Sequence, residues 1–296
     1  MVFDVVGFGF NTFDHVCLVD RPPAPDTKQR MRSYLRQPGG QVPTALVALQ
    51  RWGLRTAYVG AFGDDEGGEL QSASLIAEGV DIDGCPRRSG IGSQVSVVLV
   101  DRVTGERTVV WDRSPGLALR ADELDRGRLT SGRALLLDAG DVETALLAAG
   151  WARSAGVLVV LDVDDPGPRG EELLALSDVV VVSGDFPRRL TGESEPRRAL
   201  QRMQAMGPRL VAATLGSGGA LACDRGSFHW VPALNVPSVD STSAGDLFHA
   251  GCLYGLLQGW DAPRALRFAA VAAALECTGL GGRAAIPTFQ QVLELL

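Results

Sequence analysis

Residues 240–251, DSTSAGDLFHAG, combine small residues with a carboxylate at the start of an expected helix. Small residues at Ser243, Ala244 and Gly245 let the main chain approach a ligand closely, and the N–H groups of a first helical turn have no partner inside the helix. Together with the helix dipole, these groups form a site for an anion such as phosphate. Asp246 lies in the same turn, where a carboxylate would repel phosphate but can accept a proton from a hydroxyl that attacks it. The pattern indicates phosphoryl transfer with Asp246 as base. The alternative is that Asp246 only caps the helix and the small residues serve tight packing.

A glycine pair precedes the helical pattern that begins near residue 41. Gly39 and Gly40 permit close approach of the backbone to a ligand. Gln41 and Thr44, at the start of that helix, carry groups that can hydrogen-bond a polyol. The alternative is an ordinary turn between a strand and a helix.

Asn11 and Asp14 follow the first expected strand. They would lie at the carboxyl edge of the sheet, where open α/β sheets bind ligands. One carboxylate can accept from two neighbouring hydroxyls, which is a common way to recognise sugars. The alternative is that these side chains cap a turn.

A glycine-rich loop, TLGSGGA at 214–220, follows another apolar strand. Such a loop can hold the phosphates or the ribose of a nucleotide. Glycine-rich turns are common, so this loop indicates nucleotide binding only in combination with the other motifs. Its candidate nucleotide-binding residues are Thr214, Gly216, Ser217 and Gly219.

The elements that must position these residues alternate between apolar strands and helical patterns. The expected strands are 2–8, 56–61, 134–138, 157–162, 178–182 and 210–214, with a short one at 234–239. The expected helices are 41–52, 65–78, 142–155, 196–206, 244–258 and 262–277. This alternation predicts an α/β fold, namely a doubly wound, mostly parallel sheet flanked by helices. We expect a single domain over residues 1–296.

Two segments, about 14–36 and 92–112, break that pattern. Each suggests a pair of strands with polar alternation, and the second would turn at residues 103–106. We expect them to form a small β-sheet that stands off the main sheet as a lid and excludes water from a substrate. The alternative is an antiparallel extension at the edge of the main sheet.

The composition of the chain limits which classes of binding partner and which cellular compartment are expected. The 296 residues carry a formal charge of -7 and no basic tract, which disfavours nucleic acid and anionic membranes as partners. No apolar run reaches the roughly 18 residues that a membrane span needs. The five cysteines are widely spaced without a CxxC pair, which favours a reducing compartment. We therefore expect a cytoplasmic protein.

The order of these motifs resembles the ribokinase, or PfkB, family of carbohydrate kinases over nearly the whole chain. Its C-terminal signature D-T-x-G-A-G-D is matched by Asp240, Thr242, Ala244, Gly245 and Asp246. Its glycine pair is matched by Gly39 and Gly40, and its T-x-G-x-x-G loop by Thr214, Gly216 and Gly219. The stretches GERTVVWD and LRFAAVAAALECTGLGGRAAIP look most like the branch that holds ketohexokinase and sulfofructose kinase.

The resemblance implies a ribokinase-like fold with a β lid, ATP with Mg²⁺, and phosphorylation of a sugar-like hydroxyl. A monovalent cation is a further candidate cofactor. Thr242 would belong to the nucleotide side, and adenine would lie between residues 216–219 and the helix around Ala273 and Cys277.

Three departures from the family pattern affect these expectations. Ser243 replaces a glycine, so a left-handed backbone there would carry a side chain. Thr44 stands where many members have a sugar-binding asparagine, which leaves the identity of the sugar open. The metal-associated N-x-x-E motif corresponds to residues 183–186, SGDF, and lacks its glutamate. Asp164 and Asp185 are therefore the candidate metal ligands.

Two lid residues bear on the substrate. Lys28 is the one lysine among 28 basic residues, and related sulfofructose kinases use a lid lysine, so we expect it on the substrate side. Chance survival of Lys28 on a solvated turn is the alternative.

Trp111 and Tyr34 would suit a nucleoside base, which makes a nucleoside kinase the nearest rival function. A non-catalytic sugar sensor is the rival from another class. Apolar lid residues could pair with a second subunit in a homodimer or pack on the lid's own other strand; they are Val16, Leu18, Val97 and Leu99.

Overall fold

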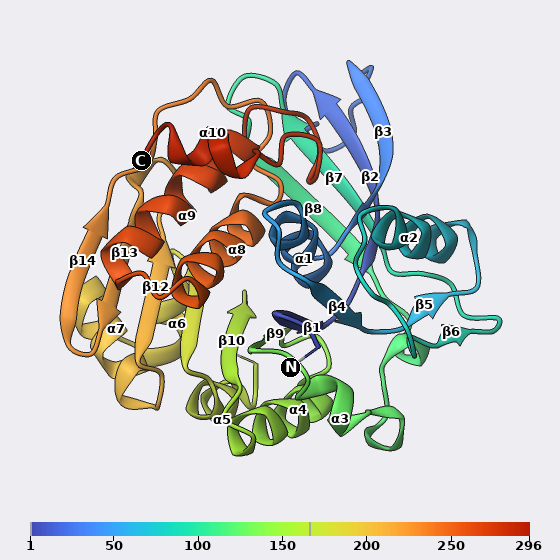
Figure 1. The fold of residues 1–296 in the computed structure, drawn as a ribbon. Coiled ribbons are helices and arrows are strands. Elements are labelled where there is room, and N and C mark those ends of the chain that lie inside the picture. The colour runs from blue at the N-terminus through green and yellow to red at the C-terminus, as the bar shows by residue number, and fades with distance from the viewer. Residues whose placement is uncertain (1, 166) are drawn as a thin grey trace.

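The computed structural model describes residues 2–165 and 167–296, built around an eight-stranded sheet (Figure 1). The strand order is β14 (Ser227–Val231), β13 (Ala220–Asp224), β12 (Leu210–Thr214), β11 (Val179–Ser183), β10 (Leu158–Val163), β9 (Ala134–Asp138), β1 (Val5–Phe8) and β4 (Thr56–Val59). The strands from β12 to β4 are parallel, whereas β13 and β14 are antiparallel.

Helices cover both faces of this sheet, which explains why its strands are apolar at successive positions. Val5 points into one core and Val6 into the other, because side chains alternate along a strand. One face packs α1 (Gln41–Arg51), α8 (Ala244–Leu257), α9 (Ala262–Glu276) and α10 (Phe289–Leu293). The other packs α3 (Arg126–Leu129), α4 (Val142–Ser154), α5 (Gly170–Leu176), α6 (Phe186–Thr191) and α7 (Pro196–Ala205).

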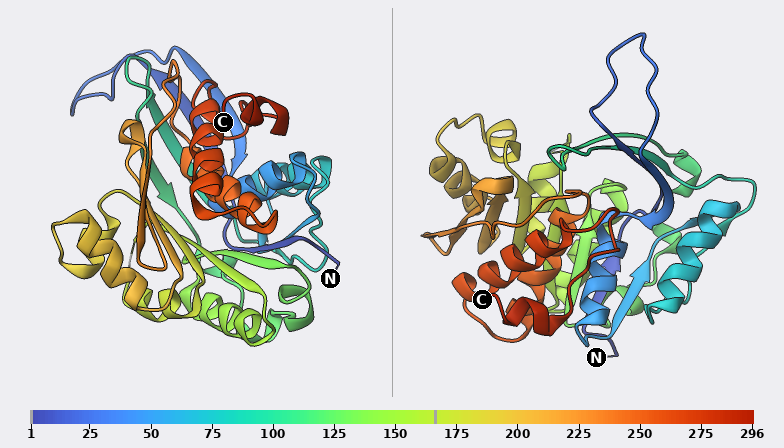
Figure 2. Two further views of the ribbon diagram at one scale, coloured as in Figure 1. Left: turned by 60° about the vertical axis from the view of Figure 1, so that its left-hand side comes forward. Right: turned by 90° about the horizontal axis from the view of Figure 1, so that it is seen from above.

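A second sheet stands off the first, as Figure 2 shows. Its order is β3 (Ser33–Gly39), β2 (Thr12–Val19), β7 (Val95–Asp101) and β8 (Arg107–Asp112), and α2 (Glu66–Ala77) packs beside it. The buried side chains of Val16, Val98 and Val100 pack with Leu35 of β3 and join this sheet to Leu280 of the C-terminal loop. The expected α/β fold with a small separate sheet is confirmed, and an extension of the main sheet is excluded.

The region after β12 differs from the prediction. Residues 234–239 form no strand, because Pro232 and Pro237 remove backbone donors and the segment runs as an extended connection. The chain instead folds back at Arg225–Gly226 to pair β13 with β14. Sequence patterns also missed the short pair β5 (Phe62–Gly63) and β6 (Arg87–Arg88).

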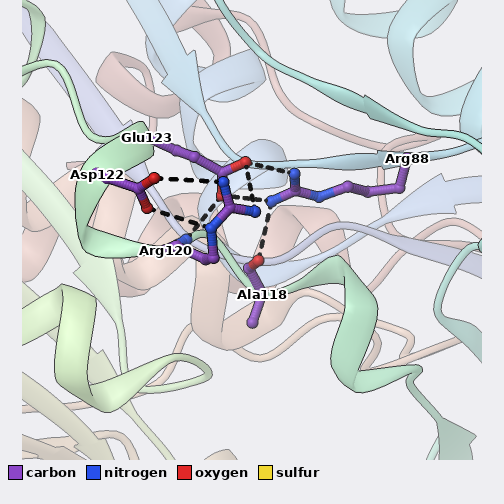
Figure 3. Close-up of polar contacts among 5 residues, drawn as sticks. All are labelled: Arg88, Ala118, Arg120, Asp122 and Glu123. Carbon is purple, nitrogen blue, oxygen red and sulfur yellow. Dashed lines mark hydrogen bonds and ion pairs between the residues drawn. The ribbon is translucent and has the colours of Figure 1, made fainter.

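An ion-pair cluster fixes the return from the lid to the main sheet (Figure 3). Arg88 Nη1 and Nη2 donate to the two oxygens of Glu123 at 2.6 and 2.7 Å, and Nη2 donates to Ala118 O at 2.9 Å. The hydrogen bonds from Arg88 lower the pKa of Glu123 to about 2. The cluster holds the 3₁₀ turns η1 (Pro115–Leu117) and η2 (Ala121–Glu123) against β6.

In the described part of the chain, no helix combines the length and the apolar character that crossing a membrane would require. All five cysteines lie within that part and carry free thiols.

Candidate active site

A cleft of about 1940 Å³ runs along the carboxyl edge of the parallel strands and beneath the lid. Asp162, Ser183 and Thr214, at the ends of β10, β11 and β12, lie on its floor. The first turn of α8 forms one wall, and the lid strands β7 and β8 form another. Both sheets therefore contribute to a single site.

The turn that begins α8 is shaped by Asp240. Asp240 Oδ1 accepts from the N–H and the hydroxyl of Thr242 at 2.8 and 2.6 Å. The chain then passes through Ser243 with φ 64° and ψ 4°, a left-handed conformation that a non-glycine residue adopts at a cost of about 1–2 kcal/mol. The family glycine that Ser243 replaces thus stands where a left-handed backbone is needed.

In this turn, residues that line the cleft carry main-chain N–H groups that are not all paired. Within the described residues, the N–H groups of Ser243 and Gly245 have no acceptor, while the N–H of Ala244 lies 3.3 Å from Ser241 O. A Cβ added at Gly245 would meet open space, which shows that the cleft reaches the backbone there. All three residues line the cleft.

Asp246 occupies the third position of α8 and lines the same wall. Burial raises the pKa of its carboxyl to about 7, against the opposing effects of the Ser243 hydroxyl and Arg107. A carboxyl with a pKa near 7 suits a general base at neutral pH, because a substantial fraction is ionised and the carboxylate is basic enough to take a proton.

The acceptor end of the cleft lies between the lid and α1. Asp14, Gly40, Gln41 and Trp111 all line it. Asp14 is 7% exposed, and its carboxylate accepts from Thr12 Oγ1. Burial raises the pKa of Asp14, while hydrogen bonds from Thr12 and Ser96 lower it. Its remaining lone pairs are available to hydroxyl donors.

Gln41 joins the acceptor end to two carboxylates of the floor. Its Nε2 donates to Asp162 Oδ1 at 3.1 Å and to Asp164 Oδ2 at 2.7 Å. The amide is thus already engaged, and its carbonyl oxygen is the part free to meet a ligand. Burial raises the pKa of Asp162, and nearby carboxylates reinforce the shift.

The nucleotide-side residues lie together along the other half of the cleft. Thr214 ends β12, and the following loop forms the 3₁₀ turn η3 (Gly216–Gly218). The cleft is lined by Thr214, Gly216, Ser217, Gly219, Thr242, Ala273 and Cys277. Burial raises the pKa of Cys277 to about 11, so this thiol is a neutral packing surface.

The two candidate metal ligands are not brought together. Asp164 lines the cleft, whereas Asp185 is exposed at the start of α6 and pairs with Arg189 at 3.3 Å. No group of three or more His, Cys, Asp or Glu side chains suited to a metal occurs in residues 2–165 and 167–296. The single carboxylate of Asp164 in the cleft still fits Mg²⁺, which is usually held by one or two carboxylates, water and substrate phosphates.

Several other predicted residues lie outside the cleft. Asn11 is buried, and its Nδ2 donates to Tyr58 OH at 2.9 Å and to Ala61 O at 2.8 Å. Thr44 is fully buried and accepts from Arg283 Nε at 3.3 Å. Gly39 packs against Asp14 so closely that no Cβ would fit, so it shapes the site from behind.

Lys28 is exposed in the loop between β2 and β3, which projects from the body of the molecule (Figure 2). The structure does not bring it to the cleft.

Sequence reasoning missed several residues that line the site. Gln94 and Ser96 are 4% and 5% exposed beside Asp14, at the start of β7. Polar residues that alternate with valines in SQVSVV were the available signal, because alternate positions of a strand share one face. Arg107 reaches from β8 to Ser241 O at 2.8 Å, and Arg113 is held by two bonds of 2.7 Å to Asp141. Their contacts link distant segments, which spacing alone does not reveal.

A family model described as "pfkB family carbohydrate kinase" matches residues 3–289. An ATP-dependent ribose-1-phosphate kinase of Halopiger xanaduensis is 30% identical and covers 99% of this chain and 97% of the relative. A ribokinase of Haemophilus influenzae is 27% identical over 96% and 95% of the two chains. A fructokinase of Escherichia coli is 30% identical over 86% and 90%.

Solved structures agree with these sequence matches. A fructokinase of Xylella fastidiosa with bound ATP superposes with a TM-score of 0.84 at 25% identity, covering 100% of this chain and 98% of the other. Arabidopsis thaliana ribokinase complexed with ribose and ATP gives a TM-score of 0.83 at 23% identity, covering 100% and 99%, and shares the fold. Placement in the ketohexokinase and sulfofructose kinase branch stays a prediction.

Proposed function

Since the chain belongs to the pfkB family of carbohydrate kinases, we propose that it transfers the γ-phosphoryl group of ATP to a hydroxyl of a sugar or polyol with Asp246 as the base. The observation that carries this proposal is the first turn of α8. A carboxyl whose pKa is raised to about 7 lies there beside the main-chain N–H groups of residues that line the cleft.

The reaction requires the acceptor oxygen and the phosphorus to be in line and in contact. Asp14, Gln41 and the Gly40 backbone orient the acceptor at one end of the cleft, and residues 214–219 hold the nucleotide at the other. The acceptor oxygen then attacks the phosphorus, its proton passes to Asp246 Oδ, and ADP leaves with the electron pair of the broken P–O bond. Positioning of this kind removes much of the entropic barrier.

Negative charge builds up on the oxygens of the transferring phosphoryl group, and the first turn of α8 can stabilise it. The N–H groups of Ser243, Ala244 and Gly245 can donate to its oxygens, with the helix dipole adding to the effect. Arg107, held against Ser241, lies close enough to lower the pKa of Asp246 and adds positive charge beside the same turn.

Asp164 is the candidate protein ligand for Mg²⁺, which would supply positive charge to neutralise part of the charge of the phosphates. A monovalent cation remains a further proposed cofactor. The expected cytoplasmic location and a homodimer through the lid also stay proposals. Val16 and Leu18 pack within the lid, whereas Val97 and the neighbouring Val110 are exposed and support the dimer, which light scattering would test.

The proposal is tested by Asp246→Asn. We expect turnover with the best sugar to fall by about 10²–10⁴, the usual contribution of a general base. ATP affinity measured by calorimetry should stay within a few-fold, since the carboxylate does not bind the phosphates. Asp261→Asn is the matched control, because Asp261 also starts a helix but caps it through the N–H of Arg264, and Asn can do the same. Near wild-type turnover of Asp246→Asn would show that Asp246 is not the base. No ADP from any sugar with the wild-type chain would favour the sensor.

The pH profile gives a second test of the same role. The base must be ionised, so kcat/KM should fall about tenfold per pH unit below about pH 7 and level off above it. The residual activity of Asp246→Asn should lack this inflection. A wild-type profile that is flat between pH 5 and 8 would contradict the assignment.

A further inference from the structure

Arg283 connects the acceptor end of the cleft to the C-terminal loop between α9 and α10. It is 8% exposed and does not line the cleft. Its guanidinium donates to Thr44 Oγ1 at 3.3 Å, to Ser74 Oγ at 3.1 Å and to Gly39 O at 3.3 Å. These acceptors lie on α1, on α2 and at the end of β3, so one side chain gathers three elements beneath the acceptor site.

The guanidinium of Arg283 is unusual because, within the part of the chain that the structure describes, it is a buried cation without a carboxylate partner. Among the described residues it forms no ion pair, and its three acceptors are a carbonyl and two hydroxyls. Burial lowers its pKa to about 10, although the carboxylates of Asp14 and Asp246 favour the charged form. A buried cation without a paired carboxylate opposes folding, so stability alone does not account for it.

The two residues before Arg283 reach the catalytic turn. Gly281 N donates to Asp240 Oδ2 at 2.9 Å, and Asp240 shapes the turn through Thr242. Gly282 lies so close to Ser243 Oγ that it has no room for a side chain. Residues 281–283 therefore contact the acceptor end on one side and the turn that begins α8 on the other.

We infer that Arg283 is a positioning residue that couples the acceptor site to the catalytic turn through the segment 281–283. This inference rests on the proposed function. Gly39 and Thr44 hold the backbone on which the acceptor rests, while Asp240 and Ser243 hold the N–H groups and Asp246. By fixing the acceptor site relative to the catalytic turn, residues 281–283 determine the distance between the acceptor hydroxyl and the base. Reaction rates are steeply sensitive to that distance.

Arg283→Lys keeps the positive charge but cannot reach three acceptors with one planar fork. We expect kcat/KM for the acceptor to fall about 10- to 100-fold, as displacements near 1 Å can cause, while KM for ATP changes by less than about twofold. Thr44→Val removes one of the acceptors. The double variant Arg283→Lys, Thr44→Val should lose less than the product of the two single losses, because both break the same contact.

A second readout does not depend on turnover. Hydrogen exchange of peptides covering residues 236–247 should be faster in Arg283→Lys, since the catalytic turn loses its anchor through 281–283. Arg88→Lys is the matched control, because Arg88 is also largely buried but pairs with Glu123 (Figure 3) and hydrogen-bonds neither the catalytic turn nor residues 281–283. We expect it to lower the melting temperature without changing exchange in 236–247.

The outcomes separate the two proposals. If the wild-type chain phosphorylates no acceptor, the proposed function fails, and the exchange measurement still decides the coupling. If Arg283→Lys is folded and keeps both wild-type acceptor kinetics and wild-type exchange in 236–247, the inference is wrong. If Arg88→Lys speeds that exchange equally, the effect is general loosening, and the inference is likewise wrong.

Discussion

The catalytic end of the cleft is formed largely by main-chain groups, whereas the acceptor end is formed by side chains. At the catalytic end, the cleft is lined by the backbone of one short turn, whose N–H groups lie beside the Asp246 carboxyl. At the acceptor end, side chains from the lid and α1 meet, among them Asp14, Ser96 and Gln41. The first end depends on backbone conformation within seven residues. The second depends on how separate elements pack.

This difference predicts how each end responds to substitution. A change that preserves the main chain should be tolerated in the catalytic turn, apart from Asp246. A change in side-chain chemistry at the acceptor end should alter recognition directly. Three substitutions, at Asp14, Ser243 and Lys28, test this contrast.

Asp14→Asn should have the largest effect of the three. Asparagine keeps the shape but replaces an oxygen acceptor with a donor and removes the charge, and hydrogen bonds to a charged group contribute about 1.5–3 kcal/mol. We therefore expect kcat/KM for the sugar to fall roughly 10- to 100-fold, with KM for ATP unchanged. Steady-state kinetics in both substrates check this. An equal rise in both KM values would indicate general distortion instead of lost recognition.

Ser243→Gly should have a much smaller effect. Glycine adopts the left-handed conformation without strain but loses more entropy on folding, so the two terms nearly cancel and the melting temperature should move by less than about 3 °C. Activity should stay within about tenfold. Because the Ser243 hydroxyl lowers the pKa of Asp246, the inflection of the pH–rate profile should move upward. A loss above tenfold, about 1.4 kcal/mol, would show that the hydroxyl itself takes part in the reaction.

Lys28→Ala should have the smallest effect. The composition favours a substrate-side role for this lysine, but the structure places it in an exposed loop outside the cleft. We expect KM for the best sugar to change by less than about twofold, and Lys28→Arg to behave alike. A severalfold rise in the sugar KM for both variants, with KM for ATP spared, would restore the sequence-based hypothesis and show that the loop reaches the substrate.

The main sheet was predictable because its signal is local. Strands 134–138 and 210–214 match their observed bounds, since short runs of buried apolar residues between helices leave few other interpretations. The pair β13 and β14 was missed because the turn at Arg225–Gly226 lacks the usual Asn-Gly or Asp-Gly signal. The strand expected at 234–239 was wrong because Pro237 within the segment and Pro232 before it each remove a backbone donor, despite the apolar residues between them.

In the candidate active site, residues close together in the sequence were predictable, whereas residues brought together from distant segments were not. The turn from Asp240 to Asp246 is continuous, so its residues lie together wherever the chain places them. Asn11 was assigned to the acceptor, yet its amide is engaged by Tyr58 and Ala61, which lie 47 and 50 residues away. Arg283 contacts Gly39 across 244 residues, so nothing in the neighbouring sequence indicates its position.

The loop that carries Lys28 has one practical consequence. Lys28 holds the one side-chain amine of the chain, and it lies on a segment that extends from the lid into solvent. An amine-reactive fluorophore would therefore modify the lid at a single side chain. Its anisotropy or energy transfer would show whether the lid moves during turnover, without the need to engineer a new attachment point.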